Sequence, residues 1–331
     1  PAAPDARMTA GRGPFGRALR LIAAMLVAVP LARDAFAGSV SATGGAAVVT
    51  ARPITAFHPS EPTRSRFGDL EFLGGLVLSS ADGDFQSLSA LLGRDSGREL
   101  IAITDEGAWV ALRLKTDAAG RPQGVEDVRI ARARDAEGRP LASKAERDAE
   151  SLALRPVPGG GEILVGFEGH HRVLSYRFSG DARGAFAAPG KPVPGLPREI
   201  AWLEGNEGLE AIAVAPAGTP LAGSLLLLAE EPRRGQADFP VWIVGGAHAG
   251  RLHLARRDRF SVTDAAFLPD GDLLVLQRRV GLRAGLAMRL LRVPAAELRP
   301  GRTAEGRVLL DADWGWEIDN MEGLAVDTAP D

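Results

Sequence analysis

Acidic residues recur along this chain at the start of short apolar runs. One such phrase reads Glu150-Ser151-Leu152-Ala153-Leu154. Carboxylates at repeated positions can hold a hard divalent cation or accept a proton from an attacking water. The pattern therefore predicts a catalytic set in which each repeat supplies one carboxylate. Its members are Glu150, Glu207, Asp264 and Glu322.

A second acidic group follows the next apolar run in each of the first three repeats. These residues are Asp105, Glu168 and Glu230, whereas Gln277 stands at the place where the fourth repeat should carry an acid. If the two runs form an antiparallel hairpin, the start of one strand lies beside the end of the other. Crowded carboxylates would repel each other and raise each other's pKa. We predict that Asp105, Glu168 and Glu230 bind Ca²⁺, an ion that prefers several oxygen ligands.

Basic side chains follow these second acids. Arg172, Arg233, Arg234 and Arg278 would lie beside the acidic rim, where guanidinium groups could bind a phosphate or a carboxylate. The sequence leaves another interpretation open. In that interpretation the acids cap strand ends and solvate the rim, and the arginines lie in solvated loops.

The elements that must position these residues are strands. From Leu70 onward the apolar runs are four to seven residues long and are bounded by Gly, Pro, Asp or Asn, which is typical of β-strands. The segments 143–150 and 284–289 are predicted to be helical. The fold class is therefore predominantly β.

The repeats are evenly spaced. Counted from Ser89, successive copies start 61, 57, 57 and 58 residues apart, at positions 89, 150, 207, 264 and 322. A period near 57 fits a four-stranded propeller blade with long loops, and a β-sandwich is the alternative. Five modules predict an all-β propeller with five or six blades. The strand at 72–78 could close the ring by pairing with the last blade, which is expected to be truncated.

The N-terminal region has the features of an export signal. After Met8, three arginines precede the apolar run 21–31, and Ala35-Phe36-Ala37 resembles a cleavage site. The run is shorter than the roughly 20 residues of a membrane-spanning helix. We expect upstream residues and a signal peptide over 1–37, a flexible arm over 38–66 and a propeller domain over 67–331 that is incomplete at its C-terminus. This arrangement predicts a periplasmic or secreted protein with no stable membrane span after cleavage.

The composition limits the classes of molecule that this protein could bind and the ways in which its fold could be stabilised. The formal net charge is −3 with 39 basic and 42 acidic residues, which argues against nucleic acid. The chain contains no cysteine, so an exported domain must be held together without disulfides.

Three phrases of this sequence resemble a known family. Glu207-Gly208-Leu209-Glu210, the run 264–272 and Asn320-Met321-Glu322-Gly323-Leu324-Ala325 are similar to the phytase-like family of bacterial exported proteins, which is described as having esterase-like activity. The similarity runs from about Phe67 to the C-terminus. It implies a β-propeller, export, and Ca²⁺-assisted hydrolysis of phosphate or other esters. Gln277 and the incomplete last blade depart from the family pattern.

Two functions of different classes follow. The first is an exported, metal-assisted hydrolase that acts on a small ester or a phosphorylated substrate at the acidic mouth of the propeller. The second is a non-catalytic propeller that binds a ligand or a protein in the cell envelope, because a fold alone does not specify a function. A lactonase-like propeller with a metal at the channel mouth stays open as a third.

Overall fold

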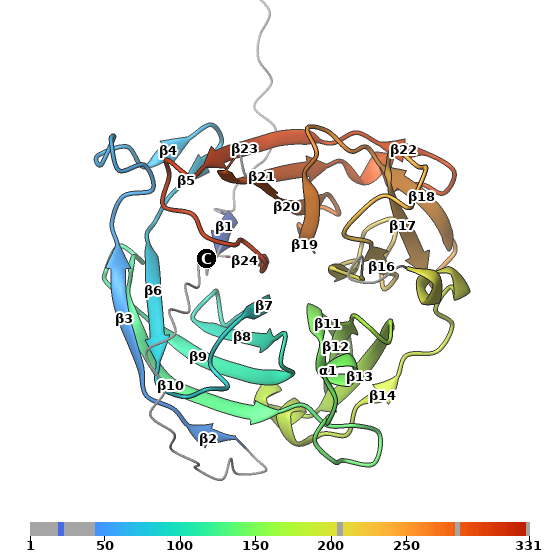
Figure 1. Cartoon of the computed structure of the whole chain (residues 1–331), viewed down its shortest axis with the longest axis horizontal. Helices are drawn as coiled ribbons and strands as arrows, with labels where there is room; N and C mark the ends of the chain where they lie inside the picture. Colours follow the sequence, from blue (N-terminus) through green and yellow to red (C-terminus); the bar gives the residue numbers. More distant parts are fainter. Residues whose placement is uncertain (1–18, 23–43, 204–207, 282–284, 329–331) are drawn as a thin grey trace, which may run out of the picture.

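A ring of β-sheets surrounds a central axis (Figure 1). The computed structural model describes residues 19–22, 44–203, 208–281 and 285–328. The apolar runs between turn residues form the strands: all six residues of the strand Glu99–Thr104 are buried, as are all four of Leu225–Leu228. The predicted all-β propeller is confirmed.

Four blades of four or five strands make up most of the ring. Neighbouring blades contact each other through their innermost strands β7, β11, β15 and β19. The strands of each blade are given from the innermost outward. Blade 1 is β7 (Leu88–Arg94), β8 (Glu99–Thr104), β9 (Ala108–Thr116), β10 (Pro122–Arg132) and β2 (Gly45–Ala46). Blade 2 is β11 (Ala149–Val157), β12 (Gly160–Phe167), β13 (Arg172–Phe178) and β14 (Lys191–Pro192). Blade 3 is β15 (Ala211–Val214), β16 (Leu225–Leu228), β17 (Phe239–Val244), β18 (Gly250–Leu254) and β22 (Thr303–Ala304). Blade 4 is β19 (Ser261–Phe267), β20 (Leu273–Gly281), β21 (Gly285–Val293) and β23 (Arg307–Asp313).

The sector between blades 4 and 1 is built differently. Its strand nearest the axis is β24 (Ala325–Thr328), which contacts both β7 and β19 and pairs with β1 (Leu19–Ile22), a strand inside the predicted signal peptide. Farther out, β3 (Val49–Ile54) pairs with β6 (Gly75–Ser80) (Figure 1). The short strands β4 (Arg66–Phe67) and β5 (Leu70–Glu71) pair with each other.

The described structure differs from three expectations. The described residues form four complete blades instead of five or six. The strand predicted at 72–78 begins at Gly75 and pairs with β3 instead of closing the ring on the last blade, because β3 supplies six partners in continuous register. Residues 45–46 and 49–54, which belong to the expected arm, form β2 and β3.

Apolar side chains pack between neighbouring blades. Between blades 1 and 2, Trp109 is fully buried, stacks on Phe186 with the ring centroids 5.3 Å apart, and meets Tyr176 edge-on at 5.2 Å. Aromatic pairs in these arrangements stabilise a core beyond the area that they bury. The blades are therefore joined by packed side chains as well as by the chain that links them.

Helical structure is short. The helix predicted at 143–150 is the single turn α1 (Lys144–Arg147), and residues 285–289 of the other predicted helix belong to β21. The 3₁₀ turns are η1 (Ala182–Ala187), η2 (Arg198–Trp202) and η3 (Ala295–Glu297). Within the described ranges, no helix has both the length and the apolar character needed to cross a membrane.

Helix α1 lies against the turns of blades 1 and 2 at one end of the ring. Gly107, in the β8–β9 turn, has φ +69°, and a Cβ there would lie 2.8 Å from the Cβ of Arg147. Gly169, in the β12–β13 turn, has φ +66°, and its Cβ would lie 3.3 Å from the Cα of Ala145. Glycine at these two positions therefore allows both a positive φ and the close approach of α1.

Alanine at Gly107 should destabilise the protein. Gly138→Ala is the control, because Gly138 has φ +83° but no atom lies within 4 Å of its Cβ position. The control should lose only the conformational term of about 1–2 kcal/mol, and Gly107→Ala should lose at least about 1 kcal/mol more through the clash with α1. Urea denaturation measures both values. Equal losses would show that α1 does not depend on this contact.

Candidate functional site

The start of each blade's first strand and the end of its second strand meet at the same end of the ring. In blades 1, 2 and 3, a residue one or two positions after the second strand donates its N–H to a carbonyl one to three residues before the first strand. These bonds join Asp105 to Ser87 at 3.0 Å, Glu168 to Asp148 at 2.8 Å and Glu230 to Gly208 at 3.1 Å. The hairpin geometry expected from the sequence is therefore present in all three blades.

A β-bulge directs Glu150 at this edge. The pairing of β11 with β12 shifts register between Ala149 and Ser151, so Glu150 is the extra residue. Bulges of this kind redirect a side chain and are frequent beside functional sites. Blade 1 has the same bulge at Ser89, and blade 4 has it at Thr263.

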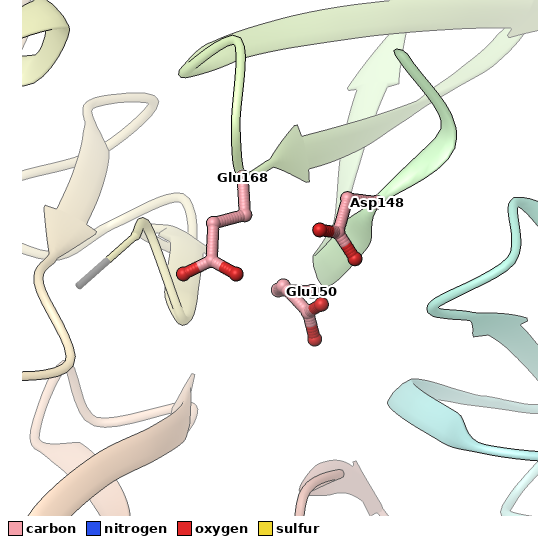
Figure 2. Close-up of side chains that lie close together, drawn as sticks. All are labelled: Asp148, Glu150 and Glu168. Atoms are coloured by element: carbon pink, nitrogen blue, oxygen red, sulfur yellow. The ribbon is translucent and has the colours of Figure 1, made fainter. Parts of the chain in front are cut away.

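Three carboxylates of blade 2 converge where these elements meet. One oxygen from each of Asp148, Glu150 and Glu168 lies within 4.8 Å of the other two (Figure 2). Glu168 also belongs to a second group, in which its oxygen and those of Glu210 and Glu230 lie within the same distance of one another. Glu168 of blade 2 is thus shared by the two groups, and the second group also contains two residues of blade 3.

The close approach of the Glu168 side chain to the backbone of blade 3 depends on a glycine there, Gly208. The N–H of Gly208 donates to Oε1 of Glu168 at 2.9 Å. A Cβ at Gly208 would lie 2.7 Å from the Cγ of Glu168, so a larger residue would displace the carboxylate. One oxygen of Glu168 is therefore held by blade 3, which leaves the other for a further partner.

Burial and like charge act together on these carboxyls. The pKa of Glu150 is raised to about 9 by burial, then by the charges of Asp148 and Glu168 and by a hydrogen bond with Asp148. Burial also raises the pKa of Glu210 well above its usual range, and the charges of Glu150 and Glu230 add to this effect. Such shifts are frequent at functional sites because the ionised forms lack compensating charge.

The same causes extend around the ring. Burial raises the pKa of Glu168, of Asp105 and of Glu322. We use the term acidic mouth for seven residues that interact electrostatically at this end of the channel: Asp105, Asp148, Glu150, Glu168, Glu210, Glu230 and Glu322.

Arg278 is the cation of blade 4 at the acidic mouth. Its Nη1 lies 2.5 Å from Glu322 and 2.6 Å from the side-chain oxygen of Asn320, and its Nη2 lies 3.6 Å from Glu230. Arg278 therefore joins blade 3 to the segment before β24. The carboxylates of Glu230 and Glu322 compensate the charge of Arg278, and these contacts link two parts of the rim.

The sequence placed Gln277 where blade 4 should carry an acid, but the strand register assigns this position to the next residue, Arg278. Arg278 pairs with Ser261, just outside the bulge of β19, so Arg278 and not Gln277 occupies the register position of Glu168. Gln277 corresponds to Phe167 and is 1% exposed. Blade 4 thus has a cation where blades 1 to 3 have carboxylates.

Asp264 does not lie with the mouth carboxylates. It is 1% exposed and accepts hydrogen bonds from the N–H of Leu324 at 2.6 Å and of Ala265 at 2.7 Å. Its neighbour Thr263 donates to the carbonyl of Met321 at 2.9 Å. Burial raises the pKa of Asp264. These contacts fasten blade 4 to the segment that carries Glu322.

Of the other predicted arginines, one lies on blade 2 and two lie on blade 3. Arg172 covers the ring of Phe167, with its Cζ 4.2 Å from the ring centroid, and donates to the backbone carbonyls of Glu146 and His170. It therefore fastens α1 to blade 2. Arg233 and Arg234 lie in the loop between β16 and β17, where Arg234 is exposed. Glu207 lies outside the described residues.

Three residues of this site were missed by the sequence reasoning. Glu210 had a usable signal, because Glu210-Ala211-Ile212-Ala213 has the same order of residue types as Glu150-Ser151-Leu152-Ala153 and Glu322-Gly323-Leu324-Ala325. The repeat of the Glu-Gly-Leu triplet favoured Glu207 instead. Asp148 and Lys144, which form an ion pair at 2.7 Å, had no such signal, because they belong to the α1 segment, and among the described residues only blade 2 has such a helix.

A protein-family model described as "Phytase-like: Esterase-like activity of phytase" matches residues 83–331. The chain belongs to the phytase-like family. This confirms the resemblance seen in the repeated phrases, and all the described members of the acidic mouth lie inside the matched region. A hydrolase of the esterase kind is the activity that this family suggests.

Curated proteins and solved structures give two further comparisons for this phytase-like chain. No curated protein matches it. Solved structures similar to it include a Dos1 propeller, with 9% identity and a TM-score of 0.34 over 69% of this chain and 61% of that one. Sqt1 from Chaetomium thermophilum has 15% identity and a TM-score of 0.32 over 70% of this chain and 50% of that one. The match thus spans about half to three fifths of the length of these proteins.

The raised pKa of Glu150 predicts how stability depends on pH. A carboxyl whose pKa is near 4.5 when unfolded and about 9 when folded stabilises the fold fully below pH 4.5, and this contribution is lost as pH rises toward 9. Glu150→Gln removes this penalty. In EDTA at pH 8 we expect the variant to exceed the wild type by at least about 1 kcal/mol in unfolding free energy, with a smaller difference at pH 5.

Urea denaturation at the two pH values measures this difference. Glu162→Gln is the control, since Glu162 lies on β12 at the other end of the blade and pairs with Arg155 at 2.5 Å. That variant should be less stable than the wild type at both pH values. A Glu150→Gln variant that is destabilised at pH 8 would mean that Glu150 is compensated by charges within the protein.

Proposed function

We propose that this chain is an exported hydrolase of small phosphate or carboxylic esters, and that Ca²⁺ bound in the acidic mouth assists the reaction. The observation that carries the proposal is the convergence of Asp148, Glu150 and Glu168 within 4.8 Å. Within the described part of the chain, neither Glu150 nor Glu168 forms an ion pair with a basic side chain. Their mutual repulsion is therefore left for another cation to relieve.

The donor set fits Ca²⁺. All the groups are carboxylate oxygens, which Ca²⁺ prefers, and the cluster has no nitrogen or sulfur ligand of the kind that selects zinc. Asp148, Glu150 and Glu168 would hold the ion, with Glu210 and Glu230 beside them. Since Ca²⁺ takes 6–8 oxygen ligands, water and substrate oxygens would complete its coordination. Bound there, the ion would polarise the ester as a Lewis acid.

The chain's own residues supply the rest of the chemistry. Glu210 is 9% exposed and lies beside Glu168 and Glu230, so its carboxyl is placed to exchange a proton with a water in the mouth. Arg278 lies at the rim and keeps Glu322 and Glu230 oriented. We thus assign Asp148, Glu150 and Glu168 to ion binding and Glu210 to catalysis, whereas Asp264 has a positioning role.

Hydrolysis of p-nitrophenyl phosphate and p-nitrophenyl acetate, with CaCl₂ or with EDTA, tests this function. We expect turnover that requires Ca²⁺ and that falls by roughly 100-fold or more in Glu168→Gln, because one ligand and one negative charge are lost. Glu137→Gln is the control, since Glu137 is an exposed acid outside the mouth. Folded wild type without turnover in either buffer would favour the ligand-binding platform, and turnover unaffected by EDTA would exclude the role of Ca²⁺.

A further inference from the structure

Lys144 places an ammonium group among oxygens at the blade 1 side of the acidic mouth. Its Nζ lies 2.7 Å from Oδ1 of Asp148 and 2.8 Å from the backbone carbonyl oxygen of Asp105. Carboxylate oxygens of Asp105 and Glu106 lie at 3.4 and 3.6 Å. A backbone carbonyl with several carboxylates is the kind of oxygen set that binds Ca²⁺.

One atom of this set lacks a partner. Oδ1 of Asp105 is buried and has no hydrogen bond, while its other oxygen faces Lys144. A buried carboxylate oxygen ordinarily has a donor or a cation beside it. The single ammonium, which has only three N–H donors, therefore does not satisfy all the oxygens that surround it.

Helix α1 fixes Lys144 at this position. The turn is seated on Gly107 and Gly169, Arg147 pairs with Glu106 at 2.6 Å, and Arg172 donates to the carbonyl of Glu146. These contacts hold α1 from blade 1 on one side and from blade 2 on the other. The ammonium therefore reaches the mouth from a fixed backbone, which lowers the entropic cost of holding a long side chain.

We infer that Lys144 is a tethered cation that occupies a second divalent-cation position, formed by Asp105, Glu106 and Asp148. This inference rests on the proposed function, in which Ca²⁺ binds on the other side of Asp148. Lys144 thereby keeps the blade 1 side of the mouth compensated without metal and confines Ca²⁺ to the side formed by Glu150 and Glu168. Removing the ammonium should open the second position to the ion.

Calorimetric titration of CaCl₂ into the full chain tests the inference. Lys144→Met keeps most of the side-chain length but removes the charge, and it should bind one more equivalent of Ca²⁺ than the wild type does. Its melting temperature should be lower than that of the wild type in EDTA, and CaCl₂ should raise it by a larger amount. Lys191→Met is the matched control, because it makes the same substitution at a lysine whose Nζ donates to the carbonyl of Ala136, outside the acidic mouth.

The outcomes separate this inference from the proposed function. Equal numbers of bound Ca²⁺ in the wild type, Lys144→Met and Lys191→Met would overturn the role of Lys144. If the wild type binds none and Lys144→Met binds one, the tethered cation is supported and the Ca²⁺ site of the proposed function fails. Lys144→Gln, which is also uncharged but can still donate to the carbonyl of Asp105, gives the same comparison if the methionine variant does not fold.

Discussion

Repulsion among carboxylates at one end of the channel is the constraint on which the rest of this structure depends. Seven acidic side chains from four sectors interact there, and burial opposes their ionisation. A fold that keeps such a cluster must supply compensation from outside the cluster. The N–H of Gly208, the ammonium of Lys144 and the guanidinium of Arg278 each compensate part of it.

The propeller architecture explains why the cluster is off-centre. Equivalent strands of successive blades bring equivalent positions to the same end of the ring, so a repeated acid would give a symmetric ring of charge. Blade 4 breaks this symmetry with Arg278, and blade 1 has Ser89 where blade 2 has Glu150. Uncompensated charge is consequently concentrated between blades 2 and 3, around Glu168.

The repeat unit and the meeting of hairpin ends could be predicted from the sequence, because strand period and turn residues are local properties. The register could not be predicted to the residue. A match of Glu-Gly-Leu triplets favoured Glu207, and a one-residue offset assigned the position of Arg278 to Gln277. Asp264 was expected at the mouth, but it is buried and accepts a hydrogen bond from the backbone N–H of Leu324 in the next sector. Lys144 lies on a helix that, within the described residues, only one blade carries, so no repeat could reveal it.

Anomalous diffraction from crystals of the chain grown with TbCl₃ would most directly test the claim that the acidic mouth binds Ca²⁺, because Tb³⁺ binds in place of Ca²⁺. A peak bonded to carboxylate oxygens of Glu150 and Glu168 is the result that the account predicts, with no peak beside the ammonium of Lys144. A mouth without a peak, in a crystal whose carboxylates lie as described above, would contradict it. In that case the acidic mouth would be compensated by protons and by its two built-in cations alone.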